Sequence, residues 1–267
     1  NVIYDPEEGI FRMWYTAVDW DAWMHQFRFK DWRAEAHGYP YFMCYAESED
    51  GVRWKKPRLE GHPYLKHDKT NVLVTGHQKA QASRVMWNPL STERDERFLL
   101  TYKDNRPDAH GAFCLAYSDD GIEWREDERN PVYVALQDTW QNMVYDPRRE
   151  RWLLFDRPRT YAGVRGVPGG PTEGNYKRRV AVHLGETPYD FGEPRVLLWP
   201  EEVDDSDFDH MVVSRRGNHF IGFLGQMGPP PKMEFNLHLA FSGDGLHWRQ
   251  LPDRSVYLPH GNSGEFD

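Results

Sequence analysis

Carboxylic acids recur in this sequence just ahead of apolar segments that predict β-strands. Asp138 precedes one such segment, Asp207 and Asp209 precede the next, and Glu265 and Asp267 stand where a further segment would begin. Cleavage of a glycosidic bond uses two carboxyl groups: one protonates the leaving oxygen, and the other activates water or attacks the sugar. We therefore expect these acids to act as general acid and as general base or nucleophile, if the fold brings them together.

Cationic and aromatic side chains accompany these acids. Lys103 and Arg157 end corresponding apolar segments, where a cation could hold a carboxylate ionised or bind an acidic sugar. The candidate substrate-binding residues are Arg84, Lys103, Arg157, His210, His77, Trp20, Trp23 and Trp140. Structural roles stay open, since an acid near a strand end can be solvated or cap a turn, and His210 can be a hydrogen-bonded core histidine.

The elements that must position these side chains are repeated. The pattern Ser-x-Asp-Gly-x-x-Trp occurs at residues 48–54, 118–124 and 242–248, each time with alanine two residues before the serine. Asp-Gly between two apolar segments predicts a β-hairpin, because glycine supplies a positive φ and the Asp and Ser side chains bond nearby backbone N–H groups. A less complete copy occupies residues 182–191. We interpret the motif as structural.

A second pattern runs in phase with the hairpins: an apolar segment, a polar turn and another apolar segment, beginning near residues 2, 85, 143 and 211. Each unit therefore predicts four antiparallel strands, as in the blades of a β-propeller, whereas a single sheet or a sandwich would not explain the repeat. We predict an all-β, five-bladed propeller that forms one domain over residues 1–267, with an incomplete ring. The blades fall at about 1–60, 70–131, 136–200 and 205–258, and a further blade starts at 261–267.

This topology separates the loops into two faces. The Asp-Gly turns share one face with the Asp-Pro turns at Asp5 and Asp146, which we interpret as structural. The opposite face carries the long segments 18–39, 104–111, 158–177 and 225–234, together with the residues that enter each first strand. Because binding residues lie preferentially on loops held by a rigid scaffold, we expect the site at this opposite face.

Composition restricts the classes of function. The formal net charge of -9 disfavours nucleic acid, and no apolar segment is long enough to span a bilayer, so we expect neither nucleic acid nor membrane as a partner. Two cysteines cannot form a disulfide framework, and no zinc-type motif occurs. We therefore expect no cofactor, but we leave open a structural cation on the propeller axis. No signal peptide is visible; we favour a secreted or periplasmic bacterial location over a cytoplasmic one, and the oligomeric state is open.

The residues that carry these patterns resemble a known group. Tyr-Asp-Pro at 4–6 with Met-Trp-Tyr at 13–15, the Asp-Gly hairpins, and Gly-Glu-Phe-Asp at 264–267 resemble the five-bladed β-propeller glycosidases, above all an uncharacterised bacterial branch similar to glycoside hydrolase families 32 and 43. The resemblance spans essentially the whole chain. It implies a carbohydrate substrate with a furanoside, pyranoside or anhydro-sugar linkage, cleaved by three axial acids. The family 32 motif Trp-x-Asn-Asp-Pro-Asn-Gly does not occur.

Other functions remain open beside a glycoside hydrolase for plant or algal polysaccharide fragments. A non-catalytic carbohydrate-binding or interaction propeller is the main alternative, because one fold hosts many functions. Its axial acids would lie far apart or be neutralised by Lys103, Arg157 and Arg84. A lyase for uronic sugars would use His or Tyr together with Arg. A sialidase ranks lower, because its Asp box has a residue between Asp and Gly and no arginine triad can be assigned here.

Overall fold

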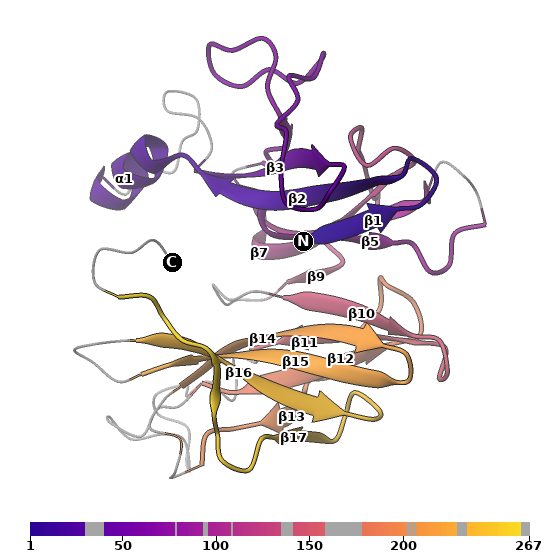
Figure 1. Cartoon of the computed structure of the whole chain (residues 1–267), viewed down its shortest axis with the longest axis vertical. Helices are drawn as coiled ribbons and strands as arrows, with labels where there is room; N and C mark the ends of the chain where they lie inside the picture. The colour runs from indigo at the N-terminus through magenta and orange to yellow at the C-terminus, as the bar shows by residue number, and fades with distance from the viewer. Residues whose placement is uncertain are drawn as a thin grey trace. The chain divides into compact units, whose positions relative to one another are not determined.

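The chain consists of two compact units, Asn1–Val134 (unit 1) and Ala135–Asp267 (unit 2). The computed structural model describes residues 1–29, 40–77, 79–92, 96–107, 109–134, 141–157, 178–201, 204, 207–228 and 234–262, with the side chains of all but residues 26–29 and 110. Figure 1 shows that each unit is built almost entirely of β-sheet.

Unit 1 contains two antiparallel sheets. The first has the order β1 (Val2–Asp5), β2 (Ile10–Val18), β3 (Tyr41–Ser48) and β4 (Val72–Val74). The second has the order β5 (Gln81–Trp87), β6 (Phe98–Arg106), β7 (Ala109–Ser118) and β8 (Arg125–Glu126), and β9 (Tyr133–Val134) also pairs with β7. The helix α1 (Trp20–Phe29) stands between β2 and β3 in the chain.

Unit 2 repeats this arrangement. Its first sheet has the order β10 (Asn142–Asp146), β11 (Arg151–Asp156), β12 (Val180–Gly185) and β13 (Arg195–Leu198). Its second has the order β14 (Asp207–Arg216), β15 (His219–Met227), β16 (Phe235–Ser242) and β17 (Trp248–Gln250), and β18 (Val256–Leu258) also pairs with β16. Each sheet follows the order of the chain, as predicted for four-stranded antiparallel blades.

The number of blades differs from the prediction. Four such sheets are present in the part of the chain that the structure describes, where we predict five. Residues 261 and 262 belong to no strand, and residues 263–267 of the predicted further blade lie outside the described residues. The first sheet also takes in β4, which lies beyond the predicted boundary near residue 60.

The Asp-Gly turns have the predicted chemistry. Asp120 Oδ1 accepts hydrogen bonds from the backbone N–H groups of Ile122 and Glu123 at 2.8 and 2.9 Å, and Ser118 Oγ accepts one from Gly121 N at 2.8 Å. The turns at Asp50 and Asp244 repeat these bonds. The φ angles of Gly51, Gly121 and Gly245 are +74°, +76° and +77°, a region that glycine adopts without strain. The Ser, Asp and Gly of the motif therefore shape the turns.

Two sheets pack together within each unit, and the same contact links their first strands. Asn1 Oδ1 accepts a hydrogen bond from Val85 N at 2.9 Å in unit 1, and Asn142 Oδ1 accepts one from Val213 N at 2.8 Å in unit 2. Behind these contacts, each unit buries one large apolar cluster drawn from both of its sheets. Burial of apolar area drives this packing, and the asparagines fix how the first strands meet.

In their described residues, two of the predicted long loops contain regular structure. Segment 18–39 contains α1, whose first turn is capped by Asp19, with its Oδ1 3.0 Å from the N–H of Ala22. Segment 104–111 is mostly the continuation of β6 and β7, which pair as far as Arg106 and Ala109. Segment 158–177 lies outside the described residues. No helix among the described residues is both long and apolar enough to cross a membrane.

Candidate functional site

The structure brings together some of the predicted site residues in unit 2. Asp209, Asp207, Arg157 and His210 meet at the ends of β11 and β14. Arg84, Lys103, His77, Trp20 and Trp23 belong to unit 1. Asp138, Trp140, Glu265 and Asp267 lie outside the described residues, so their roles stay predictions.

A bulge at the start of β14 displays Asp209. The register of β14 with β15 shifts between Phe208 and His210, so that Asp209 has no paired residue on the neighbouring strand. Phe208 and Met211, on either side, are both buried in the apolar cluster of unit 2. The irregularity therefore turns Asp209 out of the sheet while the strand stays anchored, a recurring use of bulges beside functional sites.

Two arginines from the preceding sheet hold Asp209. Arg157, which follows β11 and is 4 % exposed, donates from an Nη atom to Asp209 Oδ1 at 2.8 Å. Arg178, which precedes β12, donates to the same oxygen at 2.5 Å. The backbone N–H of Arg178 also donates to Asp207 Oδ1 at 3.2 Å. One carboxylate oxygen thus lies between two guanidinium groups, and the second acid orients the segment that carries one of them.

His210 contacts the other oxygen of Asp209. Its Nδ1 lies 3.1 Å from Asp209 Oδ2, and its ring stacks on Phe235 with centroids 5.6 Å apart and planes 19° from parallel. Gly225 on β15 makes room for this stack, because a Cβ there would lie 2.5 Å from Phe235 Cζ and 3.0 Å from His210 Cε1. The imidazole is therefore a positioned partner of the carboxylate.

The charges around Asp209 fix its protonation state. Burial alone would raise the pKa of Asp209, but the hydrogen bond from His210 and the positive charges of Arg157 and Arg178 outweigh it and lower the pKa below its ordinary value. The carboxyl group is thus ionised at neutral pH. An ionised carboxylate can act as a base, as a nucleophile or as an electrostatic partner of a developing cation, and it cannot donate a proton.

The predicted residues of unit 1 form separate local structures. His77 donates from its backbone N–H to Asp104 Oδ2 at 2.8 Å, with its ring Nδ1 3.1 Å from the same oxygen. Lys103, which precedes Asp104 in the sequence, is buried and only 2 % exposed. Trp20 and Trp23 stack with centroids 5.0 Å apart on α1. His77 and both tryptophans thus have partners within unit 1, and their role in binding stays a prediction.

Sequence reasoning missed Arg178, Phe235 and Gly225. The basic run 177–179, next to an apolar segment at the end of the Gly- and Pro-rich loop, was the available signal for Arg178. The turn acids Asp5 and Asp146 were interpreted correctly as structural. Asp5 Oδ2 accepts from Arg12 Nε at 2.9 Å, and Asp146 Oδ2 accepts from an Nη atom of Arg149 at 2.8 Å.

Metal binding has no candidate cluster in the described ranges. Within them, no three or more His, Cys, Asp or Glu side chains are grouped so that they could hold an ion. The structural cation on the propeller axis stays a prediction.

Comparison with known proteins gives distant relatives. No family model matches the chain. Two uncharacterized proteins of Mycobacterium tuberculosis, MT1551 and Rv1502, are each 24% identical over 153 residues, which are 55% of this chain and 42% of theirs. The match thus spans less than half the length of these curated relatives.

Solved structures share the fold. A thermostable family-43 glycoside hydrolase matches with a TM-score of 0.62 at 10% identity, over 94% of this chain and 70% of its own. An N-acetylgalactosamine deacetylase from F. plautii matches with a TM-score of 0.58 at 17% identity, over 86% of this chain and 69% of its own. The predicted resemblance to the family 43 propeller is therefore confirmed at the level of the fold.

Proposed function

We propose that the chain is a glycoside hydrolase that cleaves a glycosidic bond in an oligo- or polysaccharide, with Asp209 as its ionised carboxylate. The observation that carries the proposal is Asp209 itself, held between Arg157, Arg178 and His210 at the predicted face of a family 43-like fold. The structural neighbours support a carbohydrate substrate, since the family-43 glycoside hydrolase and the N-acetylgalactosamine deacetylase are both enzymes that act on sugars.

The electrostatics indicate which of the two carboxyl roles Asp209 takes, that of the ionised carboxylate and not that of the general acid. Its lowered pKa suits the base of an inverting mechanism or the nucleophile of a retaining one, because both start from the ionised form. In the second case the arginines also favour departure of the carboxylate when the glycosyl intermediate is hydrolysed, since they stabilise its negative charge. The general acid must then be another group. Our candidates for it remain Asp138, Glu265, Asp267 and Asp207, which precedes Asp209 by two residues.

Activity on a panel of neutral and acidic oligosaccharides tests this proposal. Asp209→Asn should lower the rate about 10²–10⁴-fold, the usual cost of removing one acid–base group. Asp146→Asn is the matched control, because it also removes a carboxylate that pairs with arginine in unit 2, at a structural turn. Equal rates for both variants, corrected for the folded fraction, would refute the assignment of Asp209.

A non-catalytic carbohydrate-binding propeller is the second candidate. The observation in its favour is that both oxygens of Asp209 already have partners: Oδ1 accepts from Arg157 and Arg178, and Oδ2 contacts His210. Calorimetric binding of an oligosaccharide without release of any product would support it. Products with an unsaturated sugar end would indicate a uronate lyase instead, in which His210 and the arginines take the leading roles.

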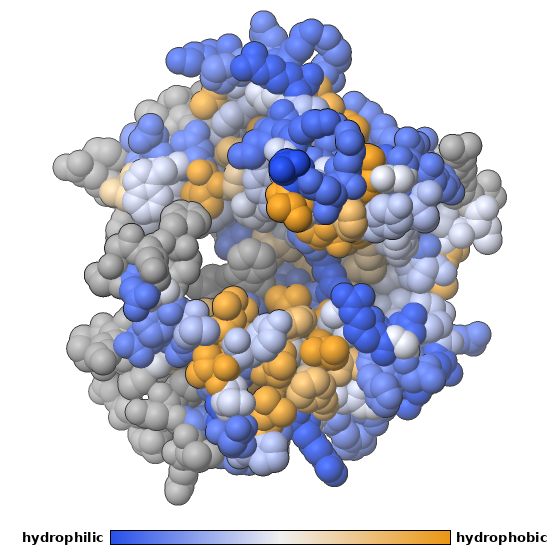
Figure 2. Space-filling view, in the orientation of Figure 1, coloured by the Kyte–Doolittle hydropathy of each residue, from blue (hydrophilic) through white to orange (hydrophobic). Residues whose placement is uncertain are grey.

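The proposal also includes a fifth blade, which would pack against the β14–β17 sheet. The face of the β14–β17 sheet that points away from the core carries Ile221, Phe223, Leu239 and Phe241, of which Phe241 is 41% exposed. Apolar side chains gather over β15, β16 and β18 in Figure 2. A further blade would cover them, as propeller blades cover each other's faces. A cysteine introduced as Phe241→Cys should then resist thiol labelling in protein purified from its natural host, and rapid labelling would contradict a fifth blade.

A further inference from the structure

The outer strand of the first sheet is interrupted by an unusually long insertion. In the second sheet, residues 127–132 separate β8 from β9, and in the fourth sheet residues 251–255 separate β17 from β18. In the first sheet, Lys55 bridges to Glu47 where this outer strand begins, and residues 56–71 precede its continuation as β4. These residues form a projecting hairpin that the other sheets of the described chain do not have.

Contacts within unit 1 hold the insertion in place. Leu59 and Thr70 form a β-bridge, and His62, which is 8 % exposed, has its Nε2 3.0 Å from a carboxylate oxygen of Glu123. The ring of Tyr64 packs on Phe42 with centroids 4.6 Å apart. The hairpin therefore presents its remaining side chains from a fixed backbone, which lowers the entropy cost of binding a ligand.

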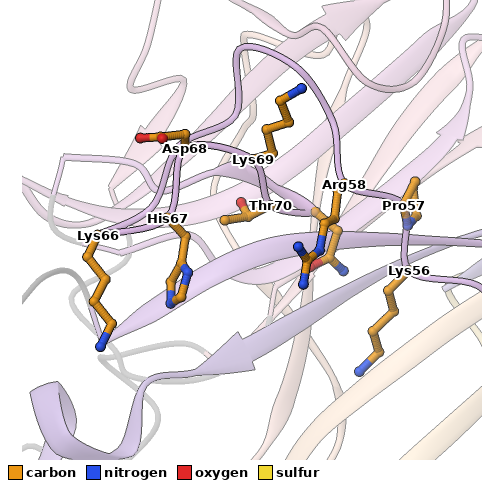
Figure 3. A pocket seen from close by; sticks show the side chains of 9 residues that line it. Lys56, Pro57, Arg58, Lys66, His67, Asp68, Lys69 and Thr70 are labelled. Carbon is orange, nitrogen blue, oxygen red and sulfur yellow. The ribbon is translucent and has the colours of Figure 1, made fainter.

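The insertion lines an open cationic pocket of about 610 Å³. Its lining comprises Lys56, Pro57, Arg58, Lys66, His67, Asp68, Lys69, Thr70 and Asn71, with four cations against one carboxylate. In Figure 3, Lys56, Arg58, Lys66 and His67 extend to one side of the loop, while Asp68 and Lys69 point to the other. Cations converging on a pocket predict an anionic ligand.

The individual cations differ in how far they are neutralised. Lys69 pairs with Glu60 outside the pocket lining, and Lys56 lies over the Tyr15 ring at 5.8 Å from its centroid. No ion pair is found for Arg58 or Lys66 among the residues that the structure describes. Positive charge is thus left uncompensated on one side of the loop in a chain whose net charge is -9.

We infer that this cavity is a binding site for a short acidic oligosaccharide, which places carboxylate or sulfate groups on Arg58, Lys66 and Lys56. Guanidinium and ammonium groups bind both kinds of anion through charge-assisted hydrogen bonds. The volume suits a small ligand. The sugar part of the inference rests on the proposed function, whereas the anion site rests on the cavity alone. A long polyanion such as nucleic acid is disfavoured, because the lining holds no Trp, Tyr or Phe ring for base stacking and the net charge of -9 repels it.

Calorimetric titration tests the inference with four probes of similar length: an oligogalacturonate, a sulfated oligosaccharide, a neutral oligosaccharide and a single-stranded oligonucleotide. The wild type should bind one or both acidic sugars and not the neutral one, and the two acidic probes distinguish carboxylate from sulfate. The double variant Lys56→Ala, Arg58→Ala should weaken binding about tenfold or more, because the loss of even one charge-assisted hydrogen bond lowers the affinity by roughly a factor of ten. Asp68→Asn should strengthen it, and added salt should weaken it.

The matched control removes two exposed cations elsewhere. Arg215→Ala with Arg216→Ala makes the same change in net charge at the β14–β15 turn of unit 2 and should leave binding unchanged. Equal loss in both double variants, no binding of either acidic sugar, or tighter binding of the oligonucleotide would each overturn the inference. Binding is measured without turnover, so a chain that hydrolyses glycans but fails here refutes only the anion site, and a chain that binds but hydrolyses nothing refutes only the proposed function.

Discussion

Gly225 on β15 is the position at which one added methyl group should disturb the candidate site most directly. A Cβ atom there would lie 2.5 Å from Phe235 Cζ and 3.0 Å from His210 Cε1, well inside van der Waals contact. The two rings would have to separate, and the Nδ1 of His210, now 3.1 Å from Asp209 Oδ2, would move with its ring. We therefore expect Gly225→Ala to weaken this hydrogen bond and to raise the pKa of Asp209 toward its ordinary value.

The energetic cost can be separated from the effect on the site. Overpacking by one methyl group costs about 1–3 kcal/mol of unfolding free energy. Gly222→Ala is the matched control on the same strand, because its Cβ would lie 2.6 Å from Met211 Sδ and 2.9 Å from Trp248 Cζ3, in the core and not at the site. We expect similar losses of stability in both variants, with a change at the site in Gly225→Ala alone.

Three measurements check this expectation. Urea unfolding gives the two losses of stability, NMR of the His210 ring protons reports the loss of stacking on Phe235, and the pH dependence of the hydrolysis rate reports Asp209. A higher pKa of Asp209 moves the acidic limb of that profile to higher pH, because the ionised form is the active one. An unshifted limb and unchanged ring signals in Gly225→Ala would refute the role of the His210–Phe235 stack.

Further predictions concern stability and reactivity. Gly121→Ala should lower the free energy of unfolding by about 2–4 kcal/mol and Gly51→Ala by about 1–2 kcal/mol, as measured by urea unfolding. Both variants place alanine at a positive φ, but only the first also puts a Cβ 2.6 Å from a carbon of the buried Trp14. Equal losses of stability would contradict this prediction. Burial raises the pKa of the Cys44 and Cys114 thiols to about 11, so iodoacetamide at about pH 8 should label them only after unfolding. The lowered pKa of Asp209 contributes stability above the ordinary carboxyl pKa that is lost as pH falls through the folded value, so Asp209→Asn should destabilise the chain more at about pH 7 than at about pH 3, and a constant difference would contradict it.

The blades were predictable because their signals are short-range. Ser118, Asp120 and Gly121 make their turn with bonds to residues no more than three positions away, so the motif alone carries the geometry. The same holds for the Asp-Pro turns. The helix α1 was not predicted, because its sequence, rich in tryptophan, gives a weak helical pattern and Asp19 alone marks its start.

The candidate site was predictable only in part, because its contacts are long-range. Asp209 and His210 are adjacent in the sequence, and their acid–histidine pair was visible there. Arg157 lies 52 positions from Asp209, and Arg178 lies 31 positions from it. The alignment of strands placed Arg157 at the correct end of its blade, but no repeat marks Arg178, which contacts Asp209 at the bulge of β14.

The asparagines that join first strands have a consequence for how such a chain can change over evolutionary time. Asn1 and Asn142 occupy the same position in the repeat. Each accepts a hydrogen bond from a valine of the sheet that follows it, Val85 or Val213. The second sheet of each unit supplies the valine and not the asparagine. Sheets of the two kinds are therefore complementary, and duplication or deletion of a gene segment should preserve this pairing only when it copies or removes two consecutive sheets together.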